Sequence, residues 1–159
     1  MLIIELLTLL ILANAAPLLA NMVLGRRFAW PVDGGIWFID GQPLFGASKT
    51  LRGLFLAVVA TSAGALLLGM PWEVGALLGV TSMCGDLFSS FIKRRLKLPP
   101  SSKATGLDQI PESLLPLLVC QPMLGLTVTE IVVVVTLFMV GGILLSPLFY
   151  KLRIRRRPY

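Results

Sequence analysis

The sequence predicts an all-α integral membrane protein with five transmembrane helices. Of its 159 residues, 56% are hydrophobic, and the mean hydropathy is +0.87, whereas soluble domains average about 45–50% apolar residues. Long apolar segments without charge alternate with short loops that carry the cations, and about 20 apolar residues are enough for a helix to cross a bilayer. We therefore expect a single transmembrane domain, residues 1–159, with no sizeable soluble domain.

The expected helices cover approximately residues 3–24, 53–71, 74–92, 110–126 and 130–150. The first two are separated by a loop that should contain a hairpin, because apolar residues alternate on either side of Asp40-Gly41, a hairpin turn sequence. Asp33, followed by two glycines, indicates a second turn in the same loop. A tight turn joins the second and third helices, and a polar loop over 93–109 joins the third and fourth.

The cations define the expected orientation. With five helices, all 14 Lys and Arg residues lie on one side of the membrane, which the positive-inside rule identifies as the cytoplasm. The N-terminus is then outside and the C-terminus inside, in the cell (cytoplasmic) membrane, with an active site that faces the cytoplasm. The net charge of +6 fits anionic lipids or an anionic substrate, so we expect no nucleic-acid partner.

Asp86 lies inside the third predicted helix, about 10 Å from its end at 1.5 Å per residue. A carboxylate in a membrane helix costs about 2.5–3.5 kcal/mol and is by default functional. Helical spacing places Ser90 and Lys93 on the same face, which predicts a polar stripe lining a hydrophilic cavity. The alternative is a buried pair between Asp86 and a cation that only fixes helix packing.

Asp108 is a second candidate, at the start of the fourth predicted helix. Taken alone, it could cap the helix N-terminus. Two carboxylates on neighbouring helices, surrounded by cations, instead suit Mg²⁺, which often accompanies a phosphate substrate. We predict Asp86 and Asp108 as metal ligands and place them, with Lys93, in the catalytic group. The chain has no histidine, which excludes histidine acid–base chemistry.

The sequence GASKTLRG, residues 46–53, predicts an anion site at the start of the second helix. It is not a Walker motif, because two residues intervene between the second glycine and Lys49. Backbone amides at a helix N-terminus, together with Ser48, Lys49, Thr50 and Arg52, can still bind phosphate; the alternative is a purely topological role for the cations. Asn14 and Asn21 share a face of the first helix and either line the same cavity or hydrogen-bond between helices.

The stretch GDLFSSFIKRRLKLPPSSKATGLDQIP, residues 85–111, resembles the signature of the CDP-archaeol synthases, which are CTP-dependent lipid-phosphate cytidylyltransferases of the membrane. Upstream, Asn14, Pro17, the two Asp-Gly turns and the G-x-S-K-T-x-R-G pattern at 46–53 follow in the same order. The resemblance covers nearly the whole chain, and we expect a bacterial-type member. Residues 110–112 lack the acid that often follows Asp-Gln in this family, although Glu112 could replace it.

The resemblance implies Mg²⁺-dependent transfer of CMP from CTP to a membrane lipid phosphate, with release of pyrophosphate. The product would be a CDP-lipid of the CDP-archaeol or CDP-diacylglycerol type in phospholipid biosynthesis, and the enzyme could be a homodimer. The metal ligands would be Asp86 and Asp108. The predicted substrate-binding residues are Asn14, Asn21, Asp33, Asp40, Ser48, Lys49, Thr50, Arg52, Ser90, Arg94, Arg95 and Gln109.

Two other classes of protein compete with this interpretation. A CDP-alcohol phosphotransferase is disfavoured because neither Asp-Gly pair is followed by Ala-Arg. The second alternative is a non-catalytic transporter or scaffold subunit in which Asp86 only pairs with a cation. Transport would be favoured by inverted repeats, and none is found in the sequence.

Overall fold

The described part of the chain folds into five helices. The computed structural model describes residues 1–25, 27–99, 102 and 104–151, with side chains up to Leu144. The helices are α1 (Leu2–Leu24), α2 (Leu51–Leu67), α3 (Trp72–Arg95), α4 (Gln109–Leu124) and α5 (Val128–Lys151). The described residues form isolated bridges but no strand, so the predicted all-α class with five helices is confirmed. Part of the positive charge used to predict the orientation, namely Arg26, Lys103 and the tail after Lys151, lies outside the described residues.

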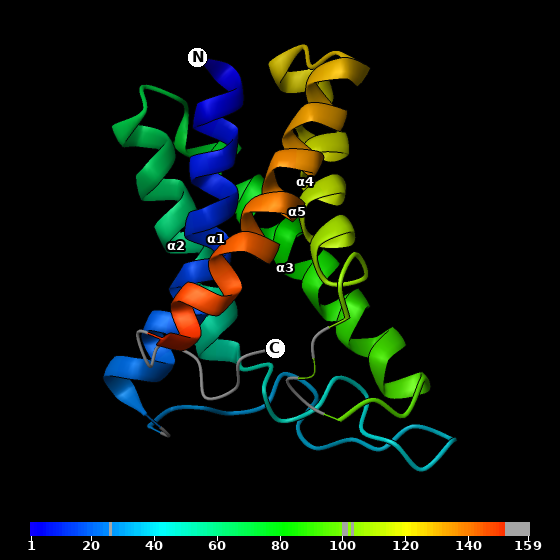
Figure 1. Ribbon diagram of the computed structural model, residues 1–159. Helices are drawn as coiled ribbons and strands as arrows, with labels where there is room; N and C mark the ends of the chain where they lie inside the picture. Colours follow the sequence, from blue (N-terminus) through cyan, green and yellow to red (C-terminus); the bar gives the residue numbers. More distant parts are fainter. Residues whose placement is uncertain (26, 100–101, 103, 152–159) are drawn as a thin grey trace.

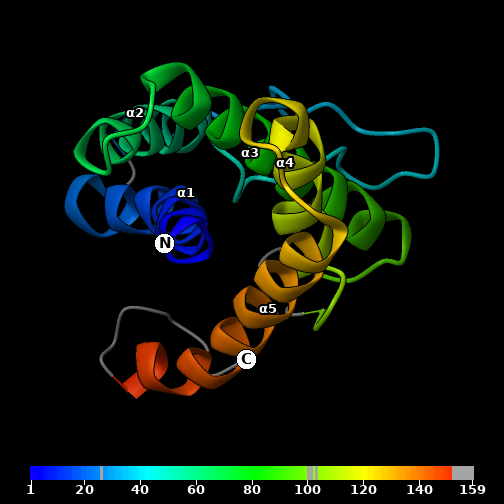
Figure 2. The same cartoon turned by 90° about the horizontal axis from the view of Figure 1, so that it is seen from above.

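Seen from above, the helices follow one another around an open arc from α1 to α5 (Figure 2). Helix α1 also contacts α3 and α5. The described parts of the two long connections, from α1 to α2 and from α3 to α4, both lie at the end of the bundle opposite the N-terminus (Figure 1). We call this end the loop end, and it carries most of the residues predicted to bind substrate.

The helix bounds differ from the predicted ones where turns intervene. Helix α2 ends at Leu67 rather than at residue 71, because residues 68–71 form the turn in which Gly69 has a φ of 75°. Helix α3 is longer than predicted and continues to Arg95, so Lys93 and Arg94 lie on its last turn. Helix α4 ends at Leu124, two residues earlier than predicted, and the next residue, Gly125, has a φ of 63°, which is readily available only to glycine.

The hydrophobic core lies away from the loop end. Leu6, Leu9 and Leu10 of α1 are fully buried together with Leu78 of α3 and Leu117 of α4. Small residues bring neighbouring helices close, as is common where helices pack in lipid. A Cβ atom at Gly75 or Gly79 of α3, for example, would overlap Thr61 of α2. This rigid contact fixes the register of α3, and therefore the height of Asp86, relative to α2.

Two of the five helices, α1 and α3, are long and apolar enough to cross a membrane when judged by length and composition. Helix α2 and the described part of α5 are apolar but shorter by this criterion. Helix α4 has 16 residues, which rise about 24 Å at 1.5 Å per residue, less than the roughly 30 Å of a hydrocarbon core. The five predicted helices are therefore present, and two of them, α1 and α3, are long and apolar enough to count as membrane spans by length and composition.

Candidate active site

Two lysine–aspartate pairs lie at the loop end of the bundle. The Nζ atom of Lys49, next to the start of α2, is 2.6 Å from both carboxylate oxygens of Asp86 on α3. The Nζ atom of Lys93, near the end of α3, is 2.6 Å from Oδ1 of Asp108. The lysine side chains are 21% and 8% exposed and the aspartates 24% and 25%. Each predicted metal ligand is thus held by a cation from a different segment.

A small cavity of about 40 Å³ adjoins the Lys49–Asp86 pair. Its polar lining consists of Ser48, Lys49, Thr50 and Asp86, and the remaining lining is apolar. Pockets that hold small molecules typically measure about 300–1,000 Å³. A nucleotide therefore does not fit while the pair is closed, and binding here requires Lys49 and Asp86 to separate.

Thr50 begins α2 and has a structural role that the sequence did not indicate. Its Oγ1 accepts a hydrogen bond from the backbone amide of Gly53 at 3.2 Å, the usual arrangement of an N-cap. Thr50 is 7% exposed. The cap begins the regular helix α2 directly after Lys49.

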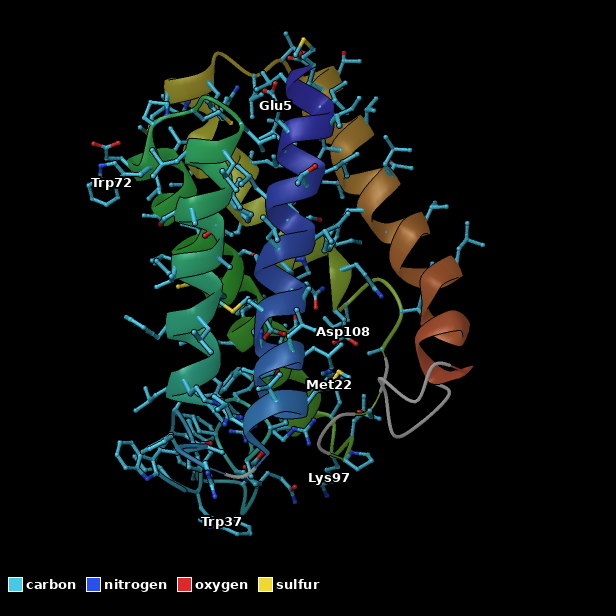
Figure 3. All side chains as sticks on the ribbon, turned by 90° about the vertical axis from the view of Figure 1, so that its left-hand side faces the viewer. Glu5, Met22, Trp37, Trp72, Lys97 and Asp108 are labelled. Atoms are coloured by element: carbon cyan, nitrogen blue, oxygen red, sulfur yellow. The ribbon has the colours of Figure 1, made fainter. Side chains whose placement is uncertain are left out.

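The carboxylate of Asp108 does not cap α4. Asp108 precedes the first residue of α4, but its side chain makes no capping hydrogen bond; instead its Oδ2 accepts from the backbone amide of Ala104 at 2.9 Å. Gln109 acts similarly, since its Oε1 accepts from the amide of Gly106 at 2.8 Å. The capping alternative for Asp108 is therefore wrong. In Figure 3, Asp108 lies deeper in the bundle than Lys97 or Trp37.

Asp33 and Asp40 form the two predicted turns of the first loop, and both turns are confirmed. Asp33 is 5% exposed, and its carboxylate accepts hydrogen bonds from the backbone amides of Gly35, Phe45 and Gly46, each at 3.0 Å. Asp40 accepts from the amide of Gln42 at 3.1 Å. Burial alone would raise the pKa of Asp33, but the amide hydrogen bonds outweigh this effect and hold it below the ordinary value.

Arg95 joins the hairpin to the end of α3. Its guanidinium lies 4.4 Å from the ring centre of Phe38 and 4.8 Å from that of Phe91. It also donates to the carbonyl of Pro43 at 2.7 Å and forms an ion pair with Asp40 at 3.1 Å. Its contacts are thus with the protein's own loop. The Phe91–Arg95 spacing of four residues could have been recognised in the sequence, whereas Phe38 could not.

Arg52 and Arg94 differ from these cations, because no acid lies within ion-pair distance of either in the described part of the chain. Arg52 donates to Oδ1 of Asn21 at 2.6 Å and to backbone carbonyls. Arg94 is 2% exposed and donates to the carbonyl of Pro99 at 3.0 Å. Its Nε and Nη1 atoms have no hydrogen-bond partner among the residues that the structure describes. A buried guanidinium with donors to spare is well suited to bind a phosphate.

Ser90 and Asn14, which are predicted to bind substrate, take no part in the two lysine–aspartate pairs. Ser90 is 2% exposed on α3, and Ser89 donates back to the carbonyl of Gly85 at 2.9 Å, so these serines are packed in the protein interior. Asn14 is exposed on α1. Gly85 was missed in the sequence: a Cβ atom there would overlap the carbonyl of Pro111. This contact brings the start of α4 against the α3 turn that carries Asp86.

The carboxylates can contribute to a metal site but do not complete one. The described residues contain no group of three or more acids, histidines or cysteines placed to hold a metal ion. Mg²⁺, however, is usually bound by one or two carboxylates together with substrate phosphates and water. Asp86 and Asp108 supply the right donor atoms for that arrangement once their lysines move aside.

Comparisons with known proteins agree on one family. Residues 62–159 match a family model described as CarS-like, CDP-archaeol synthase. The CDP-archaeol synthase of Thermococcus onnurineus is 41% identical over 109 residues, which are 62% of this chain and 61% of that one. The corresponding protein of Sulfurisphaera tokodaii is 35% identical over 137 residues, 81% of each chain. These relatives are archaeal, so they do not support the expectation of a bacterial-type member.

A solved structure has the same fold. It is described as an intramembrane enzyme for archaeal membrane lipid biosynthesis, and it superposes with a TM-score of 0.66 at 28% sequence identity. The match covers 85% of this chain and 89% of that chain.

Proposed function

The chain belongs to the CDP-archaeol synthase family, and on this basis we propose that it transfers CMP from CTP to a membrane lipid phosphate, releasing pyrophosphate. The observation that carries the proposal is the pair of lysine–aspartate contacts, Lys49–Asp86 and Lys93–Asp108, each 2.6 Å long at the loop end. Four charged groups from three segments of the chain, the start of α2, α3 and the start of α4, lie at this end, and the buried Arg94 follows Lys93 on α3. Such a cluster suits a polyphosphate better than a purely structural role.

In the proposed reaction, an oxygen of the lipid phosphate attacks the α-phosphorus of CTP while the bond to pyrophosphate breaks. No covalent intermediate with the protein is needed, so the protein contributes positioning and charge. Lys49, Lys93 and Arg94 would hold the phosphates in line. Asp86 and Asp108 would hold Mg²⁺, which when bound offsets the negative charge of the reacting phosphates.

We also propose that the loop end faces the cytoplasm in a multi-pass arrangement in the cell membrane. Among the described residues, the cations lie in the loops and the adjoining helix ends of this end, for example Lys97. Glu5 and Trp72 lie at the opposite end (Figure 3). The positive-inside rule supports this orientation. A homodimer remains a prediction.

The names of the archaeal relatives favour an ether lipid phosphate with isoprenoid chains over a diacyl lipid phosphate. Both classes present the same phosphate to the site and differ in their apolar parts, so the charged residues do not distinguish them. Purified protein should be supplied with CTP and either archaetidic acid or phosphatidic acid. The substrate with the larger kcat/KM identifies the product as CDP-archaeol or CDP-diacylglycerol.

The assay of the proposed function measures CDP-lipid and pyrophosphate with and without Mg²⁺. Asp86→Asn and Asp108→Asn should each lower turnover by about 100-fold or more, a loss comparable to that of a major charge-stabilising group. Glu73→Gln is the matched control, because it removes a carboxylate from the other end of the same helix, α3. Near-normal turnover by Asp86→Asn would contradict the assignment of metal ligands.

The non-catalytic alternative is favoured by one observation, because the Lys49–Asp86 contact is the ion pair that a scaffold subunit would need. The same assay separates the two functions. A scaffold subunit would form no CDP-lipid in any condition, and Asp86→Asn would lower its thermal stability without any catalytic consequence.

A further inference from the structure

An apolar groove runs along the surface between α1 and α2. Its volume is about 400 Å³, and all nine lining residues are apolar. Four of them are alanines, namely Ala16, Ala20, Ala60 and Ala63, and the others are leucine and valine. The small alanine side chains leave a channel between the two helices that larger residues would fill.

Arg52 lies at the loop end of this groove. It precedes the lining residues Leu56, Ala60 and Ala63 by 4, 8 and 11 positions on α2, and residues at such spacings share one face of a helix. Its guanidinium reaches across to the end of α1, where it donates to Oδ1 of Asn21 at 2.6 Å and to the carbonyl of Gly25 at 3.2 Å. The groove therefore ends at a cation.

The charge of Arg52 is not neutralised by any acid in the described part of the chain, and its Nε atom has no hydrogen-bond partner. Lys49, Lys93 and Arg95, by contrast, each have an aspartate within 3.1 Å. A guanidinium that contacts only neutral oxygens can bind a phosphate without first breaking an ion pair with an acid.

Two faces of α2 thus carry different chemistry. Thr50, Gly53 and Leu54 face the cavity beside Asp86, whereas Arg52 continues the face that forms the groove. Lys49 and Arg52 are nevertheless only three residues apart, at the same end of the helix. A phosphate held by Arg52 would consequently lie at the same end of α2 as phosphates held by Lys49.

We propose that the lipid phosphate binds with one hydrocarbon chain in the α1–α2 groove and its phosphate on Arg52, while CTP occupies the side of Lys49, Lys93 and Arg94. This inference rests on the proposed function and assigns its two substrates to separate subsites. The hydrocarbon chain of the lipid phosphate moves from the bilayer into an equally apolar groove. Its burial in the groove therefore adds little affinity. The groove orients the lipid, and Arg52 supplies the attraction.

The first test separates the substrates by their KM values. Arg52→Gln should raise the KM for the lipid phosphate by about tenfold or more, as expected when a charged hydrogen bond is lost, and should leave the KM for CTP within about twofold. Lys97→Gln, which removes an exposed cation at the same end, is the control and should change neither. A larger effect of Arg52→Gln on CTP than on the lipid would overturn the assignment.

The second test fills the groove. Ala60→Phe should lower kcat/KM about tenfold for a long-chain lipid phosphate but not for a water-soluble one with the same linkage and two six-carbon chains, because only the long chain needs the groove. Ala63→Leu, a smaller change, gives the same pattern more weakly if Ala60→Phe does not fold. Val132→Phe, on an exposed face of α5, is the control. Equal effects on both substrates, or none, would overturn the proposal.

Binding of the lipid phosphate is measured separately, in detergent and without CTP, by the shift of the unfolding temperature. If the wild type binds the lipid through Arg52 but forms no CDP-lipid, the proposed function fails and the docking assignment stands. If the wild type forms CDP-lipid but the Arg52 and groove variants bind and react normally, the docking assignment fails alone.

Discussion

Asp33 was predicted to bind substrate, but its contacts suggest that it positions the loop that carries Lys49. Its carboxylate holds three backbone amides, two of which belong to Phe45 and Gly46, 12 and 13 residues further along the chain. Substitution Asp33→Asn keeps the size of the side chain and replaces one oxygen with a donor. We expect this change to loosen the loop and, through Lys49, to lower turnover.

The magnitude follows from the hydrogen bonds. The best orientation of the asparagine keeps its oxygen on Phe45 and Gly46, so the amide of Gly35 loses its acceptor, at a cost of about 1–3 kcal/mol. The two remaining bonds change from charged to neutral, which costs about 1 kcal/mol more in total. A loss of about 3 kcal/mol corresponds to roughly a 100-fold increase in loop opening.

Hydrogen exchange measured on peptides that cover residues 31–50 reports this opening directly. Asp40→Asn is the matched control, because Asp40 lies in the same loop but contacts the amide of Gln42 and the guanidinium of Arg95 rather than the amides of Phe45 and Gly46. Protection of Phe45 and Gly46 should fall about 100-fold in Asp33→Asn and stay unchanged in Asp40→Asn. Unchanged protection in both variants would refute the positioning role.

The same contact predicts a pH dependence. The pKa of Asp33 is lowered in the folded protein from its ordinary value of 3.8, so the carboxylate stabilises the loop above that pH and loses this contribution as the pH falls through the lowered value. Protection of the loop should therefore be constant from pH 8 to about pH 5 and decline only in acid. The Asp33→Asn variant has no such acid transition at this position.

Three further predictions concern the supports of the site. Gly85→Ala should push α4 away from α3, because the new methyl group meets the carbonyl of Pro111; the unfolding temperature and turnover should both fall, while Gly141→Ala, with no neighbour near its added methyl group, serves as control. Arg95→Met should release the hairpin by removing about 1–2 kcal/mol of cation–π attraction, which is read as faster proteolysis in the first loop without loss of helix content. Thr50→Ala should cost about 1 kcal/mol of stability through the lost N-cap, and Thr50→Ser should restore most of it.

Local patterns predicted the helices and the turns well. The apolar segments gave five helices in the right order, and Asp-Gly dipeptides marked the two turns of the first loop, because turn conformation depends mainly on the residues within the turn. The end of α2 was placed too late because Leu68 and Met70 continue an apolar segment, although Gly69 and Pro71 prevent the helix from continuing through them.

The ion pairs between distant segments could not be predicted from the sequence. Helical spacing placed Lys93 on the face of Asp86, yet Lys93 pairs with Asp108, and Asp86 pairs with Lys49 from 37 residues away. These partners are chosen by the packing of α2 and α4 against α3, and spacing within one helix carries no information about them. The polar stripe of α3 is predicted to line a cavity, and Asp86 does so, whereas Ser90 is packed in the interior.

In the two lysine–aspartate pairs the positive and negative charges cancel. The net charge of the site without substrate therefore comes from the guanidinium groups of Arg52 and Arg94. An anion that binds a lysine by itself leaves the paired aspartate without a counterion. A cation that binds an aspartate by itself leaves the paired lysine without one. A ligand that brings both signs together, such as a divalent ion already complexed to a polyphosphate, satisfies all four groups at once. The site would therefore admit the complex in preference to either of its components.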